Sequence, residues 1–261
     1  MFRSLNVAAS GMAAQETQLD TIANNLANAN TTGYKSQQVQ FEDLLYENVR
    51  APGANSNGMT PPTATQLGTG VRVVATTRSF AQGTLQTTNN PLDLAIQGQG
   101  FFAVMQPTGT LGYTRAGSLQ LNAQGQLTTP NGLPIEPPMT IPSNATSITV
   151  AADGTVSVQQ AGATTSTNVG QLQLTTFPNP NGLQAEGANI FTPTVASGQP
   201  QTGAPAVDGR GTILQGSIES SNVDVVTEMV AMITAQRAYE MDSKVISAAD
   251  DMMRTATQSS Q

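Results

Sequence analysis

Apolar side chains recur at helical spacing near both ends of this sequence. Between about residues 4 and 30 there is no proline, and a leucine or methionine returns at every seventh position. Such a repeat predicts an amphipathic α-helix that ends near Gly33. Gly11 costs this helix about 1 kcal/mol relative to alanine, so packing must offset the cost or a second helix must approach closely there. The apolar positions of the segment are Leu5, Met12, Leu19, Ile22 and Leu26.

The C-terminal segment shows the same pattern over a longer stretch without proline, which reaches about Thr257. Residues 220–222 are candidate N-caps, and Asp224 and Glu228 would lie near the positive end of the helix dipole. The stripe is wider than the seam of a two-stranded coiled coil, so this helix needs more than one neighbour. Its repeat is Val225, Met232, Tyr239, Ile246 and Met253, widened by Val226, Met229, Val230, Ile233, Val245, Ala248 and Met252.

Between the two helices the apolar period changes from about 3.5 to 2, which predicts β structure. One hairpin is expected to turn at Asp153-Gly154, and a second at residues 122–125. Residues 51–70 are rich in Pro, Gly, Asn and Thr and indicate an extended linker. The expected hairpins and strands occupy residues 118–129, 147–158, 100–105, 172–177 and about 71–77.

We therefore expect an α+β protein whose N- and C-terminal α-helices pair as an elongated coiled coil, with a β-rich domain between them. The expected divisions are residues 1–32 for the N-terminal helix, 33–75 for an extended linker and connecting segment, 76–219 for the β-rich outer domain, and 220–261 for the C-terminal helix. Apolar stripes at helical spacing usually belong to a protein's own core. Two helices of this length would extend beyond the β domain, so their outer stripe would be exposed and would need partners.

Composition narrows the possible chemistry. The chain has no cysteine and no histidine, which removes the sulfur nucleophile, the commonest general base and the commonest metal ligands. A net charge of −7 argues against a nucleic acid partner. Only 10% of the residues are charged, against about 25% in ordinary domains, which suits a surface that becomes an interface but also fits a secreted low-charge β protein. No stretch is apolar enough to span a membrane, and the start does not resemble a cleavable secretory signal.

No catalytic, cofactor-binding or metal-binding residue is expected. Gly98-Gln99-Gly100 does not complete a phosphate-binding motif. Acidic residues of the β region could form the carboxylate pair of a glycan hydrolase, so a secreted cell-wall glycan hydrolase stays open as an alternative. Scattered surface acids are the favoured interpretation, because turns explain two of them and three acids of the C-terminal helix are spaced like a solvated face. The residues concerned are Asp93, Glu136, Asp153 and Asp208 in the β region and Asp242, Asp250 and Asp251 in the helix.

Longer strings carry a resemblance to a known family. NNLANANTTGYK (24–35), GQGFFAV (98–104), YTRAGSLQLNAQGQL (113–127) and NVDVVTEMVAMITAQRAYEMDSKVI (222–246) resemble, in order, motifs of the rod and hook family of bacterial flagellar axial proteins. FEDLLYENVRAPGA (41–54), LGTGVRV (67–73) and QLTTFPNPNGL (173–183) resemble the distal-rod branch, with the proximal-rod branch as the nearest alternative. Leu119 and Asn122 depart from the family's usual Phe and Asp but keep strand and turn character. The resemblance covers essentially the whole chain.

The resemblance implies a non-catalytic structural protomer without cofactors. It implies a hollow helical polymer in the periplasm-spanning rod of the basal body, with the terminal helices around a central channel, which transmits motor torque to the hook. The implied partners are further copies of the chain, proximal rod proteins, the hook protein, the P-ring and L-ring bushing proteins and the flagellar type III export apparatus. Neither nucleic acid nor a membrane-embedded state is implied, and an adhesin or surface-layer protein would lack these terminal helices.

The polymer interface is expected on the helical stripes and on the motif that follows the first helix. Its predicted residues are Leu5, Met12, Leu19, Ile22, Leu26, Tyr34, Val225, Met229, Met232, Ile233, Tyr239, Ile246 and Met253. The family resemblance also suggests that the linker from about residue 46 to residue 66 braces neighbouring protomers.

Overall fold

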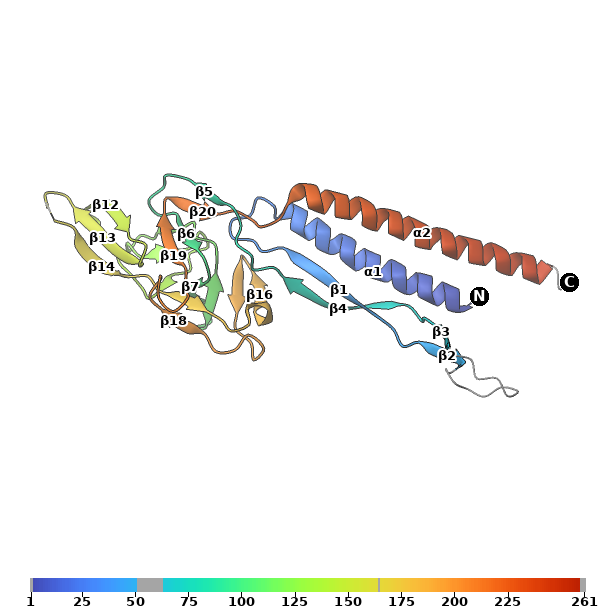
Figure 1. Ribbon diagram of the computed structural model, residues 1–261. Helices are drawn as coiled ribbons and strands as arrows, with labels where there is room; N and C mark the ends of the chain where they lie inside the picture. Colours follow the sequence, from blue (N-terminus) through green and yellow to red (C-terminus); the bar gives the residue numbers. More distant parts are fainter. Residues whose placement is uncertain (1, 51–62, 164, 259–261) are drawn as a thin grey trace. The chain divides into compact units, whose positions relative to one another are not determined.

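The computed structural model describes residues 2–50, 63–163 and 165–258 (Figure 1). The chain folds as two compact units. The first, which we call the helical unit, is formed by the residues up to 27, residues 37–77 and the residues from 224 onward. The second, the β unit, is formed by residues 28–36 and 78–223. Two terminal helices with a β-rich middle confirm the α+β class.

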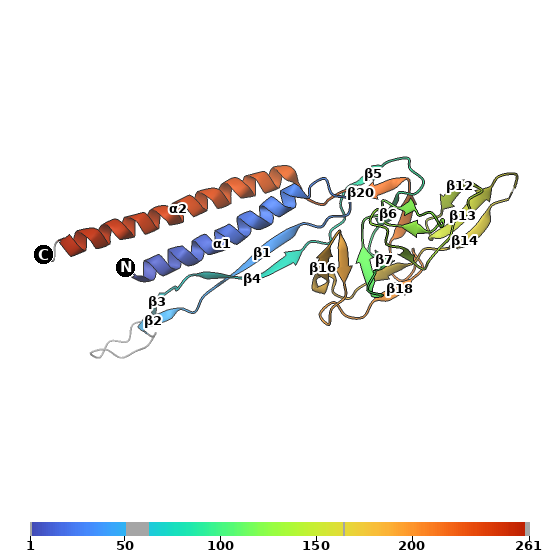
Figure 2. The ribbon, with the colours of Figure 1, turned by 180° about the vertical axis from the view of Figure 1, so that it is seen from behind.

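Two long helices form the core of the helical unit, α1 (Phe2–Ala27) and α2 (Val225–Gln258). They lie side by side and run in opposite directions, so that the start of α1 and the end of α2 lie at the same end of the pair (Figures 1 and 2). Gly11 lies against the Asp242 side chain, where an added Cβ would be only 2.8 Å from Oδ2. The glycine predicted to permit a close approach of a second helix is therefore at such a contact.

The start of α2 differs from the expectation. Asp224 caps the helix, because its Oδ1 accepts hydrogen bonds from the backbone amides of Val226 (3.0 Å) and Thr227 (3.4 Å). Asn222, one of the predicted caps, instead belongs to the β unit, where its side chain accepts a hydrogen bond from Ser36 N and donates one to Ser79 O. The prediction of a cap at residues 220–222 was wrong by two residues, because an Asx side chain serves either role and only the tertiary contacts decide between them.

The segment expected to be an extended linker contains four strands. Strand β1 (Gln37–Asp43) pairs with β4 (Val71–Arg78), and β2 (Glu47–Arg50) pairs with β3 (Thr65–Leu67). The β1–β4 ribbon follows α1 (Figures 1 and 2). The strand expected near residues 71–77 is confirmed. Most of the predicted linker, residues 51–62, lies outside the described residues.

The β unit contains small antiparallel sheets. The largest has the order β16 (Gln184–Gly187), β17 (Ile190–Thr192), β8 (Leu111–Thr114), β7 (Phe101–Met105), β15 (Leu174–Thr176) and β18 (Gln201–Gly203), with β11 (Ile135–Glu136) also paired to β7. The others are β12 (Ala145–Val150), β13 (Thr155–Gln160) and β14 (Thr167–Gln171); β19 (Thr212–Gln215) with β6 (Leu94–Gln97); β20 (Ser217–Glu219) with β5 (Leu85–Thr87); and β9 (Gln120–Leu121) with β10 (Leu127–Thr128). A 3-10 turn spans Pro180–Gly182.

Strand β7 has cores on both of its faces, which explains why FFAVM is apolar throughout. Phe102 and Val104 point into an aliphatic core, whereas Phe101 and Ala103 point into a smaller aromatic core. Both predicted hairpins and the strands predicted at residues 100–105 and 172–177 are confirmed. Gly154, in the turn of one hairpin, has a φ of +84°, which glycine adopts without steric cost.

Candidate functional site

Alanines line part of the side of α2 that packs on α1. Ala235 and Ala249 are buried, and Ala231 and Ala238 are half-buried. Asn25 of α1 is 1% exposed and bridges the elements around it. Its Nδ2 donates to Glu228 Oε1 of α2 (2.9 Å) and to Gln37 O of β1 (2.8 Å), while its Oδ1 accepts from Gln37 N. Small side chains and one satisfied polar contact thus contribute to this helix pair, together with the half-buried Met232, Ile246 and Met253 of α2.

The large apolar residues at the start of α2 face away from α1. At about 100° per residue, Val226, Met229, Val230 and Ile233 lie on the side of α2 opposite Ala235, and Val225 lies at the edge of this arc. Each is 41–70% exposed although all five are aliphatic. Further along α2, Tyr239, Met241, Val245 and Met252 are also exposed. We call the first group the outer face of α2; it consists of Val225, Val226, Met229, Val230 and Ile233.

The predicted interface residues fall into three groups. Ile22 and Tyr34 are buried within the chain, and the Arg78 guanidinium lies 6.0 Å from the ring centre of Tyr34. Four residues are exposed, namely Val225, Met229, Ile233 and Tyr239. The remaining seven are half-buried, namely Leu5, Met12, Leu19, Leu26, Met232, Ile246 and Met253. Among the described residues, neither helix has a stretch apolar enough to cross a bilayer.

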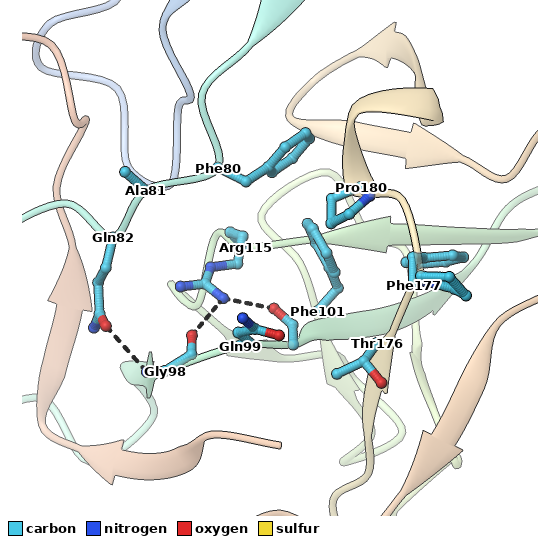
Figure 3. A pocket seen from close by; sticks show the side chains of 12 residues that line it. Phe80, Ala81, Gln82, Gly98, Gln99, Phe101, Arg115, Thr176, Phe177 and Pro180 are labelled. Atoms are coloured by element: carbon cyan, nitrogen blue, oxygen red, sulfur yellow. Dashed lines mark hydrogen bonds between the residues drawn. The ribbon is translucent and has the colours of Figure 1, made fainter. Parts of the chain in front are cut away.

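The β unit contains a buried ion cluster that sequence reasoning missed. Glu219, which is 0% exposed, accepts hydrogen bonds from Lys35 Nζ (2.6 Å), Arg115 Nε (2.9 Å) and Gly83 N (2.8 Å). Arg115 Nη1 also donates to Gly98 O (2.9 Å) and Gly100 O (2.7 Å), as Figure 3 shows. The glycine pair that resembled part of a phosphate loop therefore presents carbonyl groups to a guanidinium, and both glycines have positive φ.

Burial dominates the electrostatics of this cluster. Removal from water lowers the pKa of Lys35, and its hydrogen bond and attraction to Glu219 oppose that shift. Lys35 Nζ also donates to Ala81 O at 2.7 Å. The cluster joins chain positions 35, 115 and 219, which carry two positive charges and one negative charge.

A cavity of about 450 Å³ lies beside Arg115, lined by Phe80, Phe101, Phe177 and Pro180 among others (Figure 3). Its lining includes no carboxylate side chain among the described residues. A glycan hydrolase needs two carboxyl groups on either side of its substrate, so this cavity does not offer that chemistry.

The acidic residues of the β region serve local structure instead. Asp93 accepts a hydrogen bond from Thr88 Oγ1, Asp153 Oδ1 accepts one from Thr155 N in the hairpin turn, and Asp208 pairs with Arg210. Glu136 lies in β11. The turn interpretation of Asp153 and Asp208 is confirmed. In α2, by contrast, Asp242 lies against Gly11 rather than on a solvated face.

Comparison with known proteins gives matches along the chain. Residues 5–35 match the family described as "Flagella basal body rod protein", residues 95–158 match "Flagellar hook protein FlgE/F/G D1 domain", and residues 214–259 match "Flagellar basal body rod FlgEFG protein C-terminal".

Curated relatives align over almost their full length. The chain is 47% identical to the flagellar basal-body rod protein FlgG of Caulobacter vibrioides, over 98% of each chain. It is 46% identical to FlgG of Buchnera aphidicola subsp. Acyrthosiphon pisum, over 99% of this chain and 100% of the relative. It is 34% identical to FlgG of Bacillus subtilis, over 97% of each. These matches confirm the family resemblance, and the chain belongs to the flagellar basal-body rod proteins, which are non-enzymatic structural components of the bacterial flagellar basal body.

Proposed function

We propose that this chain is the protomer of the flagellar distal rod. In this proposal copies of the chain polymerise into a rigid hollow helical shaft that transmits motor torque to the hook and passes exported subunits through its channel. The full-length similarity to relatives named FlgG supports the distal-rod assignment. The partners would be other copies of the chain, proximal rod proteins, the hook protein, the P-ring and L-ring proteins and the type III export apparatus.

The outer face of α2 is the observation that carries this proposal. Five neighbouring aliphatic side chains remain 41–70% exposed after the helix has packed on α1. Covering a half-exposed aliphatic side chain contributes about 1 kcal/mol, so this face offers roughly 5 kcal/mol to an interface before the cost of association. A contiguous apolar face of this kind is typical of an interaction surface.

We also propose that α1 and α2 form an antiparallel coiled coil in the rod. Two contacts support one constant register. Gly11 lies opposite Asp242, and Asn25 bonds to Glu228, so fourteen residues along α1 correspond to fourteen residues back along α2. The apolar residues of the outer face of α2 remain exposed in the single chain and are free to contact neighbouring copies.

The substitution Ile233→Asp tests the polymer assignment. A charge on the outer face would have to be buried at each contact, so we expect assembly of the purified chain to be lost, as judged by sedimentation and electron microscopy. The near-UV circular dichroism of Tyr113, in the β unit, should not change. Ile233→Val is the matched control and should assemble normally. Normal tubes from Ile233→Asp would contradict the proposal.

A brace between protomers is proposed for residues 46–66, of which 51–62 lie outside the described residues. Deleting the segment should leave polymerisation intact but give curved or more flexible rods, measurable as a shorter persistence length in micrographs. Straight rods of unchanged stiffness would remove this role.

A further inference from the structure

Asp242 is a half-buried carboxylate on the inner side of α2. Its Oδ2 lies where a Cβ on Gly11 would be 2.8 Å away, so the absence of a side chain at residue 11 makes room for it. Among the described residues, none donates a hydrogen bond to this carboxylate or forms an ion pair with it. Its position therefore leaves a charge without a partner inside the helical unit.

The carboxylate borders a groove of about 690 Å³ within the helical unit. Val7 and Ala8 of α1, Leu67 of β3, Val71 of β4 and Val245 of α2 give the groove a mainly apolar lining. Arg3 also borders it but pairs with Glu47. We call this site the Asp242 groove. A purely apolar occupant would bury the carboxylate without a partner, which costs free energy, so the groove favours an occupant that brings a cation between apolar side chains.

Such a group is present elsewhere on α2. Arg237 is exposed, and no acidic group of the described residues pairs with it. Its neighbours one turn earlier and one turn later on the helix are Ile233, 48% exposed, and Met241, 61% exposed. Lys244 is also exposed, but the residue one turn before it is the acidic Glu240. The row Ile233–Arg237–Met241 thus has the apolar, cationic, apolar sequence that the groove requires.

We infer that Arg237 of one copy enters the Asp242 groove of a second copy and pairs with Asp242. The inference rests on the proposed function and identifies one contact of the polymer. A planar guanidinium binds a carboxylate through two parallel hydrogen bonds, so such a contact fixes the relative orientation of the two copies and also stabilises their association. The row and the groove are different surfaces of one chain, so the contact joins copies head to tail and leaves a free row and a free groove at the ends, as an open helical array requires.

Charge reversal and its rescue test this contact in the full-length chain. Arg237→Glu alone and Asp242→Lys alone should each raise the critical concentration for polymerisation by about tenfold or more, because like charges would meet at the contact. The double variant should recover most of this loss, because the pair is restored with its signs exchanged. Lys244→Glu makes the same change of charge on the exposed side of α2 and is the matched control, expected to change the critical concentration by less than about twofold.

Folding is followed separately by circular dichroism at 222 nm. If Asp242→Lys loses helix content, a double-mutant cycle with Asp242→Asn and Arg237→Gln replaces the charge reversal. Increases in critical concentration that are not additive in this cycle support the pair. The inference is overturned if wild-type tubes form and both reversals polymerise like wild type, or if the double variant is as impaired as the two losses combined. If the wild-type chain forms no tubes, the proposed function itself fails.

Discussion

Glu219 carries the negative charge of the buried ion cluster in the β unit and pairs with both Lys35 and Arg115. Glu219→Gln keeps the size and shape of the side chain but removes its charge. The change leaves Lys35 and Arg115, 0% and 4% exposed at their side chains, without a counter-charge. Their remaining hydrogen bonds go to the carbonyl groups of Ala81, Gly98 and Gly100, which carry only partial charges.

Removing one partner of a buried ion pair costs about 3–5 kcal/mol, because the other charge stays buried and uncompensated. A domain has about 5–15 kcal/mol of stability in total, so this loss would be a large part of it. We expect Glu219→Gln to lower the free energy of unfolding of the β unit by about that amount. Adding Lys35→Met should recover part of the loss, because it removes one buried charge and fills the same space.

The assay is urea unfolding followed by near-UV circular dichroism, which reports on Tyr34 and Tyr113 because both are buried in the β unit. Glu186→Gln is the matched control, since Glu186 is exposed and accepts a hydrogen bond from Gln106 Nε2. It should change the free energy of unfolding by less than about 0.5 kcal/mol. The reasoning is refuted if Glu219→Gln and Glu186→Gln unfold at the same urea concentration, or if Lys35→Met makes the first variant still less stable.

Three further predictions concern the helices. The hydroxyl and amide of Thr227, with the amide of Val226, hold the pKa of Asp224 below its usual range, so its capping contribution is complete above about pH 4 and is lost as pH falls through the lower folded pKa. Asp224→Asn keeps a capping side chain that does not titrate, so it should lose less helix signal between about pH 5 and 2 than wild type. Equal losses in the two proteins would contradict the assignment of Asp224 as the cap. Gly11→Ala should stabilise the Asp242→Ala variant by about 1 kcal/mol in urea unfolding, because the contact with Asp242 is gone and alanine favours a helix; no gain would mean that backbone contacts, not Asp242, require the glycine. Leu19→Asp should abolish assembly while the β unit unfolds at the wild-type urea concentration, and normal tubes from this variant would remove α1 from the interface.

Elements with local signals could be predicted from the sequence. The Asp153-Gly154 turn, the strand FFAVM and the two amphipathic helices each depend on residues close together in the chain, and each is present. Gly11 was also informative, because a glycine inside a good helix pattern points to a close contact.

Features that depend on distant pairings could not be predicted. Lys35, Arg115 and Glu219 look like ordinary charged residues until the fold brings them together. The pairing of β1 with β4 could not be predicted because the two strands are far apart in the sequence and no short turn connects them directly. The buried positions Ala235 and Ala249 of α2 were missed because alanines carry little hydrophobic signal, although the predicted repeat did include the half-buried Met232, Ile246 and Met253.

Methionine oxidation tests the central claim most directly. Met229, Met241 and Met252 are 51–61% exposed on α2, so hydrogen peroxide should oxidise them readily in the unassembled chain. If neighbouring copies cover α2 in the rod, mass spectrometry of assembled tubes should show strong protection of Met229 and Met241. Equal oxidation rates in tubes and in free chain would contradict the account, as would a free chain in which these methionines already resist oxidation.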